Sequence, residues 1–428
     1  MKKNLVKLMA CVLATVSLGS LVSCGDEVQA VDTVEINVWA TEKEEAVIKK
    51  VVEQWNADHP ANEQFNIKFT AIAEGDAGTQ LAKDPTVEGA PALFLCADDH
   101  INELRSKSII AEIKGERREK IEKNNSDVAV LGVTQDDKVW GYPVTSDNGY
   151  FLWYNKGFAG VQDKIGSLED LLAFAEANKK TVLMDVGNGW YANSFIMSPQ
   201  ACGVESLKWV NDANNNVVYE TSWDDATGVK VSEYIGGLLA PYYEKGVLVS
   251  GSNAEITDGF KNGSMIAAVS GTWMEGDLVA AVGEANLGAD KLPEYHIDGK
   301  AYQMASFGGS KVYCINKTRP AAEQLTAATL AELLNTADAQ LIRFEERGCL
   351  PCNKEAAKDK RYTENVSIGG AAFLKQSAYA CVQAQTAEGR YWDIGLAIGS
   401  AYINGLTEGV TWAQFLKQQM DILRTPVA

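Results

Sequence analysis

The sequence predicts an α/β protein of two lobes, each built on a mostly parallel sheet flanked by helices. The chain has 428 residues, more than one hydrophobic core usually serves, so two domains are expected. Along the chain, short apolar strands alternate with helices whose apolar residues recur every three to four positions. Residues 92–96 (ALFLC) are apolar throughout, which is typical of a parallel strand that is buried on both faces.

The first elements can be assigned from their periodicity. Residues 34–39 alternate apolar and polar side chains, as a half-buried strand does. Residues 44–55 place apolar side chains from Val47 to Trp55 at helical spacing. The remaining elements of this part are strands at 67–72 and 92–96 and a helix that begins near Asp98.

A second series of strands and helices follows an extended aromatic stretch, residues 138–158, through which Pro143 forbids a helix. Residues 212–220 place oxygens like a calcium loop but lack its glycine and its final glutamate, so we expect a hairpin there. The other expected elements are a helix at 168–177, a strand at 182–184, a helix at 226–245, a strand at 265–269, an extended run at 302–315 and a helical region at 321–346.

Residues 1–23 have the features of a secretory signal: a basic start followed by an apolar run too short to span a bilayer. The run ends in LVSC, which resembles the bacterial lipobox. Cys24 is therefore predicted to be the lipidated first residue of the mature chain, with residues 24–31 as a tether. Ordinary cleavage near Ala30, which would discard Cys24, is the alternative. No other segment is apolar enough to cross a membrane, so the lipid would be the only membrane attachment.

The composition argues against several classes of function. A net charge of −18 disfavours nucleic acid and anionic lipid as partners. The three histidines, His59, His100 and His296, are isolated, so neither a metal site nor a catalytic triad is expected. No phosphate-binding glycine loop is present, and no cofactor is expected. Six cysteines beyond Cys11 and Cys24 allow fifteen disulfide pairings, among which the sequence does not select.

The most informative stretch is FKNGSMIAAVSGTWMEGDL, residues 260–278, in which an apolar strand stops at Ser270-Gly271 and Trp273 stands just beyond it. An indole at this place either fills a core or offers a flat face to a ligand. A sugar ring has an apolar face that suits an indole, and a rim of hydroxyls that needs carboxylates or amides. Buried hydroxyls without partners are costly, so a sugar site needs both kinds of residue.

Dispersed pieces of the chain, in order, resemble the bacterial extracellular solute-binding proteins (family 1) of ABC sugar importers, and are similar to maltose/maltodextrin-binding proteins. The pieces cover nearly all of the chain after the signal. They are a strand ending at Trp39, PALF (91–94) followed by Asp98, GYPV (141–144), YNK (154–156), the stretch around Trp273, and Gly308-Gly309 before a strand that ends at Asn316-Lys317.

The resemblance implies the type II periplasmic-binding-protein-like fold, with solute held in a cleft between two hinged lobes. The N-terminal lobe would comprise 32–146 plus 304–358, and the C-terminal lobe 147–303 plus 359–428. The chain would cross between the lobes near Thr145–Asp147, Ser306 and Asp359.

The resemblance also implies a set of site residues. Trp273 would be a sugar platform, and further positions match the family's pattern one at a time. The expected stacking aromatics are Trp39, Trp190 or Tyr191, and Trp392, with Tyr391 as its rival; the expected hydroxyl partners are Glu42, Glu44, Asp98 and Asp147. Asp99 and Leu95 depart from the maltose-type pattern, which argues against maltose itself. For each aromatic, packing in a core is the competing interpretation.

The implied function is a lipid-anchored substrate-binding protein of an ABC transporter, on the extracytoplasmic face of the cell membrane. It would capture a carbohydrate, an oligosaccharide by preference, and deliver it to the permease subunits as a monomer without catalysing a reaction. Two alternatives stay open. A surface glycoside hydrolase would also need tryptophan platforms and a pair of carboxylates. A sugar-sensing or adhesion subunit would use the same fold.

Overall fold

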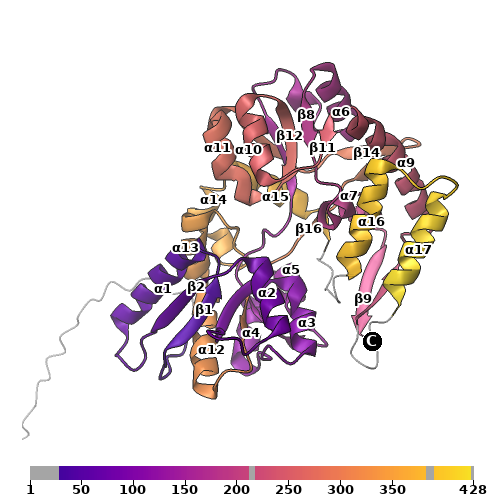
Figure 1. The fold of residues 1–428 in the computed structure, drawn as a ribbon. Helices are drawn as coiled ribbons and strands as arrows, with labels where there is room; N and C mark the ends of the chain where they lie inside the picture. Colours follow the sequence, from indigo (N-terminus) through magenta and orange to yellow (C-terminus); the bar gives the residue numbers. More distant parts are fainter. Residues whose placement is uncertain (1–27, 212–216, 382–389, 426–428) are drawn as a thin grey trace, which may run out of the picture.

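The computed structural model describes residues 28–211, 217–381 and 390–425. The predicted signal peptide (1–23) and the predicted lipidation site, Cys24, lie outside these residues. The described chain forms two α/β lobes, one above the other in Figure 1, which confirms the predicted fold class. Val28 and Ala30 already pack against the core of the N-terminal lobe, so the end of the predicted tether contacts the folded protein.

The N-terminal lobe has a five-stranded sheet in the order β2-β1-β3-β17-β6. β1 (Ile36–Ala40) is parallel to both β2 (Ile67–Ala71) and β3 (Leu93–Ala97). β17 (Lys311–Ile315) is antiparallel to β3 and to β6 (Tyr142–Pro143). The helices of this lobe are α1 (Glu44–Asp58), α2 (Glu74–Lys83), α3 (Ile101–Ser106), α4 (Gly115–Asn124), α5 (Asp127–Gly132), α12 (Ala321–Asn335) and α13 (Ala337–Arg347).

Local chemistry explains where the last two of these helices meet. The predicted helical region 321–346 is divided at Thr336, whose hydroxyl accepts a hydrogen bond from the Ala339 N–H, 3.3 Å away, and so caps α13. α13 ends at Gly348, which has φ +70°, a left-handed conformation that glycine adopts at little cost. The chain therefore turns sharply at both ends of α13, and its C-terminal end is directed toward the second lobe.

The C-terminal lobe has a five-stranded sheet in the order β11-β8-β12-β7-β13. β11 (Leu248–Val249), β8 (Thr181–Leu183) and β12 (Met265–Ser270) are parallel to one another. β7 (Phe151–Asn155) is antiparallel to β12 and to β13 (Leu287–Asp290). The helices of this lobe are α6 (Leu168–Ala177), α7 (Gly189–Ile196), α8 (Ser198–Ala201), α9 (Ala226–Glu244), α10 (Asn253–Asn262), α11 (Glu275–Val282), α15 (Ile368–Ser377), α16 (Arg390–Asn404) and α17 (Trp412–Arg424).

Shorter elements complete the fold. β9 (Leu207–Asn211) pairs antiparallel with β10 (Val217–Thr221), which confirms the hairpin predicted in place of a calcium loop; its turn lies outside the described residues. The others are β4 (Thr134–Gln135), β5 (Lys138–Val139), β14 (Glu294–Ile297), β15 (Lys300–Gln303), β16 (Ser306–Phe307), β18 (Ala380–Cys381), α14 (Lys360–Thr363) and the 3₁₀ turns η1 (Asp98–His100), η2 (Val161–Asp163), η3 (Thr272–Met274), η4 (Glu284–Asn286) and η5 (Ala356–Lys358).

Three segments meet where the lobes join. The backbones of Asn148 and Gly309 exchange two hydrogen bonds of 3.1 Å, and the Ser146 N–H donates to the Leu350 carbonyl at 2.9 Å. Phe307 is fully buried and packs in the core of the C-terminal lobe, together with Met304 and Ala305. The chain therefore leaves that lobe after Phe307, a few residues beyond the predicted boundary at 304.

Buried apolar residues form one cluster in each lobe and a third cluster that joins the lobes. In this third cluster, Leu341 and Phe344 of α13 pack with Trp153 and Phe373 of the C-terminal lobe. The junction between the lobes therefore has a packed interior on one side. Among the described residues, none of the helices is both long and apolar enough to cross a lipid bilayer.

Candidate functional site

A cavity of about 890 Å³ lies where the two lobes face each other. Its volume is within the range usual for small-molecule sites, about 300–1,000 Å³. Both lobes and the junction between them contribute to it. The lining residues are Lys43, Asp147, Asn148, Trp190, Thr272, Trp273, Glu275, Gly276, Asp277, Lys311, Glu346, Arg347, Gly348, Cys349 and Ser367. We call this space the main cavity.

The topology of the sheets explains why these residues meet. Lys43 follows the carboxyl end of β1, and Trp273 follows the carboxyl end of β12. Trp190 is in the first turn of α7, the helix that follows β8. Ligands of open α/β sheets collect at the carboxyl ends of the parallel strands. The main cavity lies where these ends of the two sheets face each other.

Trp273 has 40% of its surface exposed, more than Trp190, the other aromatic residue that lines the main cavity. Its ring lies close against Gly271: a Cβ atom on Gly271 would stand 2.0 Å from Cζ3 of the indole. The glycine therefore allows the indole to fold back across its own backbone while 40% of the residue stays exposed. Trp273 does not pack in a core, so the interpretation of this residue as core is wrong.

Trp273 begins a row of aromatic rings along the C-terminal lobe. Its ring centroid is 5.9 Å from that of Trp190, with an angle of 32° between the planes. Trp190 lies nearly parallel to Phe307, at 6.2 Å and 18°, and Phe307 meets Trp392 edge-on at 5.6 Å and 84°. We call these four residues the aromatic row. Its two ends lie in different cavities, because Trp392 lines a second one.

Four carboxylates line the main cavity and differ in how strongly they are engaged; one of them, Glu346, pairs with Lys50 at 3.0 Å. Asp147 is buried, and one of its oxygens accepts a hydrogen bond from the Leu350 N–H at 3.0 Å. Burial raises the pKa of Asp147 above its ordinary value. Glu275 accepts from the Ser367 hydroxyl at 2.5 Å and from the Gly369 N–H at 3.2 Å, so it holds the start of α15. Asp277 is exposed.

The wall from the N-terminal lobe contributes basic groups that the sequence prediction missed. Lys43, Lys311 and Arg347 all line the main cavity. Lys43 lies shortly after the end of β1, as Trp273 lies shortly after the end of β12. The same position beyond a strand could therefore have identified Lys43 from the sequence. Lys311 and Arg347 carry no such sequence signal, because β17 and α13 reach this cavity only through the crossings between the lobes.

Glu44 was predicted to bind sugar hydroxyls, and the structure corrects that prediction. Its side chain is 0% exposed and its carboxylate accepts hydrogen bonds from Arg343 Nε at 2.7 Å, from Arg347 Nη1 and from the Tyr313 hydroxyl at 3.1 Å. Burial by itself would raise the pKa of Glu44, but the two guanidinium groups outweigh it and hold this pKa below its ordinary value. Glu44 ties α1 to α13 and has no surface left for a ligand.

Trp39 and Asp98 also lie in the interior of the N-terminal lobe, outside the lining of the main cavity. Trp39 is 5% exposed and packs in that lobe's core. Asp98 is 2% exposed, and its Oδ2 accepts a hydrogen bond from the Ser310 N–H at 2.9 Å. Burial and the neighbouring charge of Asp99 raise the pKa of Asp98 to about 7. Asp98 therefore contacts the backbone just before β17 and does not line the main cavity.

The remaining predicted residues divide between the two walls and the surface. Asp147, Trp190 and Trp273 line the main cavity. Tyr191 is half-buried against Trp190, with ring centroids 5.1 Å apart. Glu42 is exposed in the loop before α1 and does not belong to the lining. Burial raises the pKa of Tyr191 to about 12, so its hydroxyl stays protonated.

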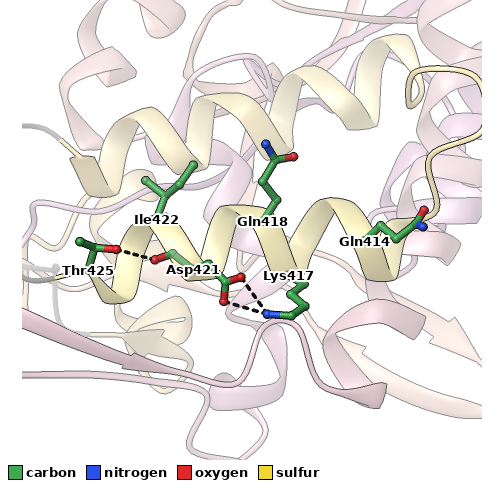
Figure 2. A pocket seen from close by; sticks show the side chains of 6 residues that line it. All are labelled: Gln414, Lys417, Gln418, Asp421, Ile422 and Thr425. Carbon is green, nitrogen blue, oxygen red and sulfur yellow. Dashed lines mark hydrogen bonds and ion pairs between the residues drawn. The ribbon is translucent and has the colours of Figure 1, made fainter.

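Two further cavities differ from the main cavity in the residues that line them. The second, of about 570 Å³, is lined by Trp392 together with loops at the edge of the C-terminal sheet. Figure 2 shows a third, of about 530 Å³, along α17. It is lined by residues of that helix and its C-cap only, has no aromatic side chain, and its Lys417–Asp421 ion pair of 2.8 Å stays within the helix. The third cavity is therefore a groove on the surface of one helix.

Cysteines and other potential metal ligands make no additional site within the described ranges. The six cysteines there are free thiols, and burial raises the pKa of Cys352 to about 12. In that part of the chain, no three His, Cys, Asp or Glu side chains come together as ligands of a metal ion would.

Comparisons with known proteins identify the family. A family model described as bacterial extracellular solute-binding protein matches residues 50–369. A structure solved with acarbose is 26% identical, with a TM-score of 0.74, over 92% of this chain and 99% of that one. The maltodextrin-binding protein MalE1 from L. casei BL23 is 19% identical, with a TM-score of 0.76, over 92% and 99% of the two chains. MalX from Streptococcus pneumoniae, solved with maltopentaose, is 19% identical, with a TM-score of 0.70, over 90% and 99%.

The two relatives below 25% identity show that the fold is shared. A search of the curated proteins found no match. The family model covers most of the chain, including both lobes and the residues that line the main cavity from Lys311 to Ser367. The chain thus belongs to the bacterial extracellular solute-binding proteins.

Proposed function

We propose that this protein is the lipid-anchored substrate-binding protein of an ABC transporter, and that it captures an oligosaccharide between its lobes and delivers it to the permease. The observation that carries the proposal is the exposed indole of Trp273 in a cavity shared by both lobes. A large apolar ring left open to water beside charged groups suits the apolar face and hydroxyl rim of a sugar. The relative solved with acarbose supports a carbohydrate ligand.

The walls of the main cavity supply both the ring faces and the hydrogen-bonding groups that a sugar needs. Trp190 and Trp273 offer ring faces from the C-terminal lobe, while Lys43 and Lys311 offer ammonium donors from the N-terminal lobe. Asp277 adds a carboxylate acceptor. Because the donors and the ring faces come from different lobes, a sugar between them makes its full set of contacts only when the lobes approach. Ligand binding would then favour a closed form over an open one.

Ligand binding can be tested by thermal unfolding. The purified mature protein is screened against neutral mono- and oligosaccharides, amino acids and short peptides. An oligosaccharide is expected to raise the melting temperature, because a ligand that binds only the folded state stabilises it. A rise with amino acids or peptides alone would contradict the proposal. Chromatography of the same mixtures checks for cleavage, and turnover would favour the surface glycoside hydrolase.

Anchoring and delivery need separate tests in cells. A Cys24→Ala variant should lose fatty-acid labelling and leave the membrane fraction, because the predicted acceptor thiol is gone. Unchanged labelling would contradict the lipoprotein prediction. Crosslinking in the membrane should recover permease subunits with the wild type; recovery of a sensor or adhesin complex instead would favour the third interpretation.

A further inference from the structure

A further cavity, of about 440 Å³, lies across the crossings from the main cavity, and we call it the rear cavity. Neighbouring residues of the chain line the two cavities at three places: Ser146 and Asp147, Leu350 and Cys349, and Val366 and Ser367, the first of each pair lining the rear cavity. The first two places are joined, because the Ser146 N–H donates to the Leu350 carbonyl at 2.9 Å. The crossings and the start of α15 therefore form the wall between the two cavities.

The walls of the rear cavity belong to different lobes. Leu350 follows α13 of the N-terminal lobe, and the ring of Tyr362 packs edge-on against Phe344 of that helix, with centroids 5.1 Å apart. Phe373 lies opposite on α15, which packs against β13 of the C-terminal lobe. Leu350, Tyr362 and Phe373 are all members of the apolar cluster that joins the lobes. The rear cavity is therefore a gap in the packing of this junction.

The side chains that line the rear cavity restrict what it can bind. None of the described residues that line it is charged, so an ion would lose its water there without gaining a partner. Tyr362 is 6% exposed, and in the described part of the chain its hydroxyl has no hydrogen-bond partner. A buried hydroxyl without a partner is costly, so Tyr362 favours a ligand that carries a hydrogen-bonding group of its own. Tyr362 and Phe373 add aromatic rings, which suit a ring in the ligand.

The position of the rear cavity couples it to the main cavity. Because the crossings lie between the two cavities, a rotation that brings the walls of the main cavity together moves the walls of the rear cavity apart. In the structure the main cavity is open to water, since 40% of Trp273 is exposed. A molecule that contacts both walls of the rear cavity in this arrangement loses contacts when the lobes close on a sugar. Its binding therefore favours the open arrangement.

From these observations we infer that the rear cavity binds a small uncharged molecule with an apolar ring and a hydroxyl or similar group, and that this molecule lowers the affinity of the main cavity for its sugar. The coupling rests on the proposed function of the main cavity, whereas binding in the rear cavity does not. Because coupling between two sites is reciprocal, the sugar lowers the affinity of the rear cavity by the same factor.

Benzyl alcohol is the probe for the rear cavity, and its binding to the mature protein without sugar is measured by ligand-observed NMR. Benzoate and benzylamine, which are of similar size but charged at neutral pH, should bind at least about ten-fold more weakly. Tyr362→Phe removes only the hydroxyl. It should weaken binding of benzyl alcohol by about two- to ten-fold and leave binding of toluene unchanged, because toluene makes no hydrogen bond.

Ala357 provides a way to fill the rear cavity, because it lines this cavity at an exposed position. Ala357→Trp should weaken benzyl alcohol by about ten-fold or more, and Ala357→Ser is the matched control because it adds a single oxygen. Calorimetry with an oligosaccharide from the thermal screen then measures the coupling. Saturating benzyl alcohol should lower the oligosaccharide affinity of wild type and Ala357→Ser by about five-fold or more, and leave that of Ala357→Trp unchanged.

The outcomes separate the two proposals. If benzyl alcohol does not bind wild type, or if Tyr362→Phe and Ala357→Trp both bind it as wild type does, the rear site is overturned and the main site stands. If bound benzyl alcohol leaves the oligosaccharide affinity of wild type unchanged, the regulatory coupling is overturned. If no oligosaccharide binds, the proposed function fails and the coupling fails with it, while the NMR titrations still decide whether the rear cavity is a site.

Discussion

Glu44 and Arg343 form an ion pair from which water is excluded. The Arg343 Nε–Glu44 Oε1 distance is 2.7 Å, and the two side chains are 0% and 1% exposed. They come from the first turn of α1 and the middle of α13, 299 residues apart in the chain. Because α13 ends at the main cavity, this pair connects the framework of the N-terminal lobe to the wall that carries Arg347.

Glu44→Gln should therefore destabilise the protein. The substitution keeps the shape of the side chain but leaves two guanidinium groups near a neutral amide, and breaking a buried pair costs about 3–5 kcal/mol. Urea unfolding followed by circular dichroism measures the free energy of unfolding. Lys50→Met is the control, because the Lys50–Glu346 pair is exposed and should contribute little. A loss equal to that of the control would show that the buried pair is not needed.

Trp273→Ala should weaken oligosaccharide binding by about 30-fold or more, as expected for a central aromatic contact, while the protein stays folded. The indole is 40% exposed, so its removal leaves little cavity in the core. Trp153→Ala is the contrasting variant: Trp153 is 0% exposed, its Nε1–H donates to the Gly271 carbonyl at 3.1 Å, and its loss should cost about 3–5 kcal/mol of stability. Calorimetry and thermal unfolding measure affinity and stability of both variants; a Trp273→Ala protein that binds oligosaccharide as tightly as the wild type would contradict the platform.

Gly271→Ala tests how the platform is positioned. The added Cβ would stand 2.0–2.5 Å from three ring atoms of Trp273, so the indole must swing away. Because the ring is partly exposed, it can move at small cost to stability, and affinity should fall toward that of Trp273→Ala. Wild-type affinity in this variant, measured by the same titration, would mean that the position of the ring does not matter.

Asp98 should make stability depend on pH in a predictable direction. Its pKa in the folded protein is about 7, above the ordinary value of 3.8, so between these pH values the folded state binds more protons than the unfolded state. Stability from this group is present at low pH and is lost as pH rises through about 7. Asp98→Asn should remove about 2 kcal/mol of the difference in unfolding free energy between pH 5 and pH 7. If the free energy of unfolding depends on pH in the same way in wild type and variant, Asp98 does not contribute to that dependence.

Much of the architecture could be predicted because it depends on local patterns. The helix predicted at 168–177 has those bounds in the structure, and the strand at 265–269 differs by one residue. The helical region predicted at 321–346 is helical in the structure but consists of two helices, α12 and α13, because Thr336 caps a new helix inside it. In the sequence, the capping preference of a threonine is a weak signal beside a continuous helical pattern of apolar residues. Only the packed structure decides whether the helix continues or a new one begins there.

The candidate site was predicted less completely. Trp273 was located by its place just beyond an apolar strand and Trp190, with Tyr191 as the alternative, by the family resemblance; both tryptophans line the main cavity. Glu44 follows a strand too, but it is buried between two arginines that are distant in the sequence. Position after a strand therefore indicates the edge of the sheet at which a residue lies. It does not indicate which side chains from distant parts of the chain contact that residue.

By itself, the sequence determined two α/β lobes, their order along the chain and an aromatic residue at the end of β12, because periodicity and strand ends are properties of neighbouring residues. Only the tertiary structure decided that Phe307 joins the aromatic row, that Lys311 and Arg347 line the main cavity with Trp273, and that Glu44 and Asp98 are buried outside that lining. These outcomes depend on crossings between the lobes, where burial and ion pairing are set by residues hundreds of positions apart.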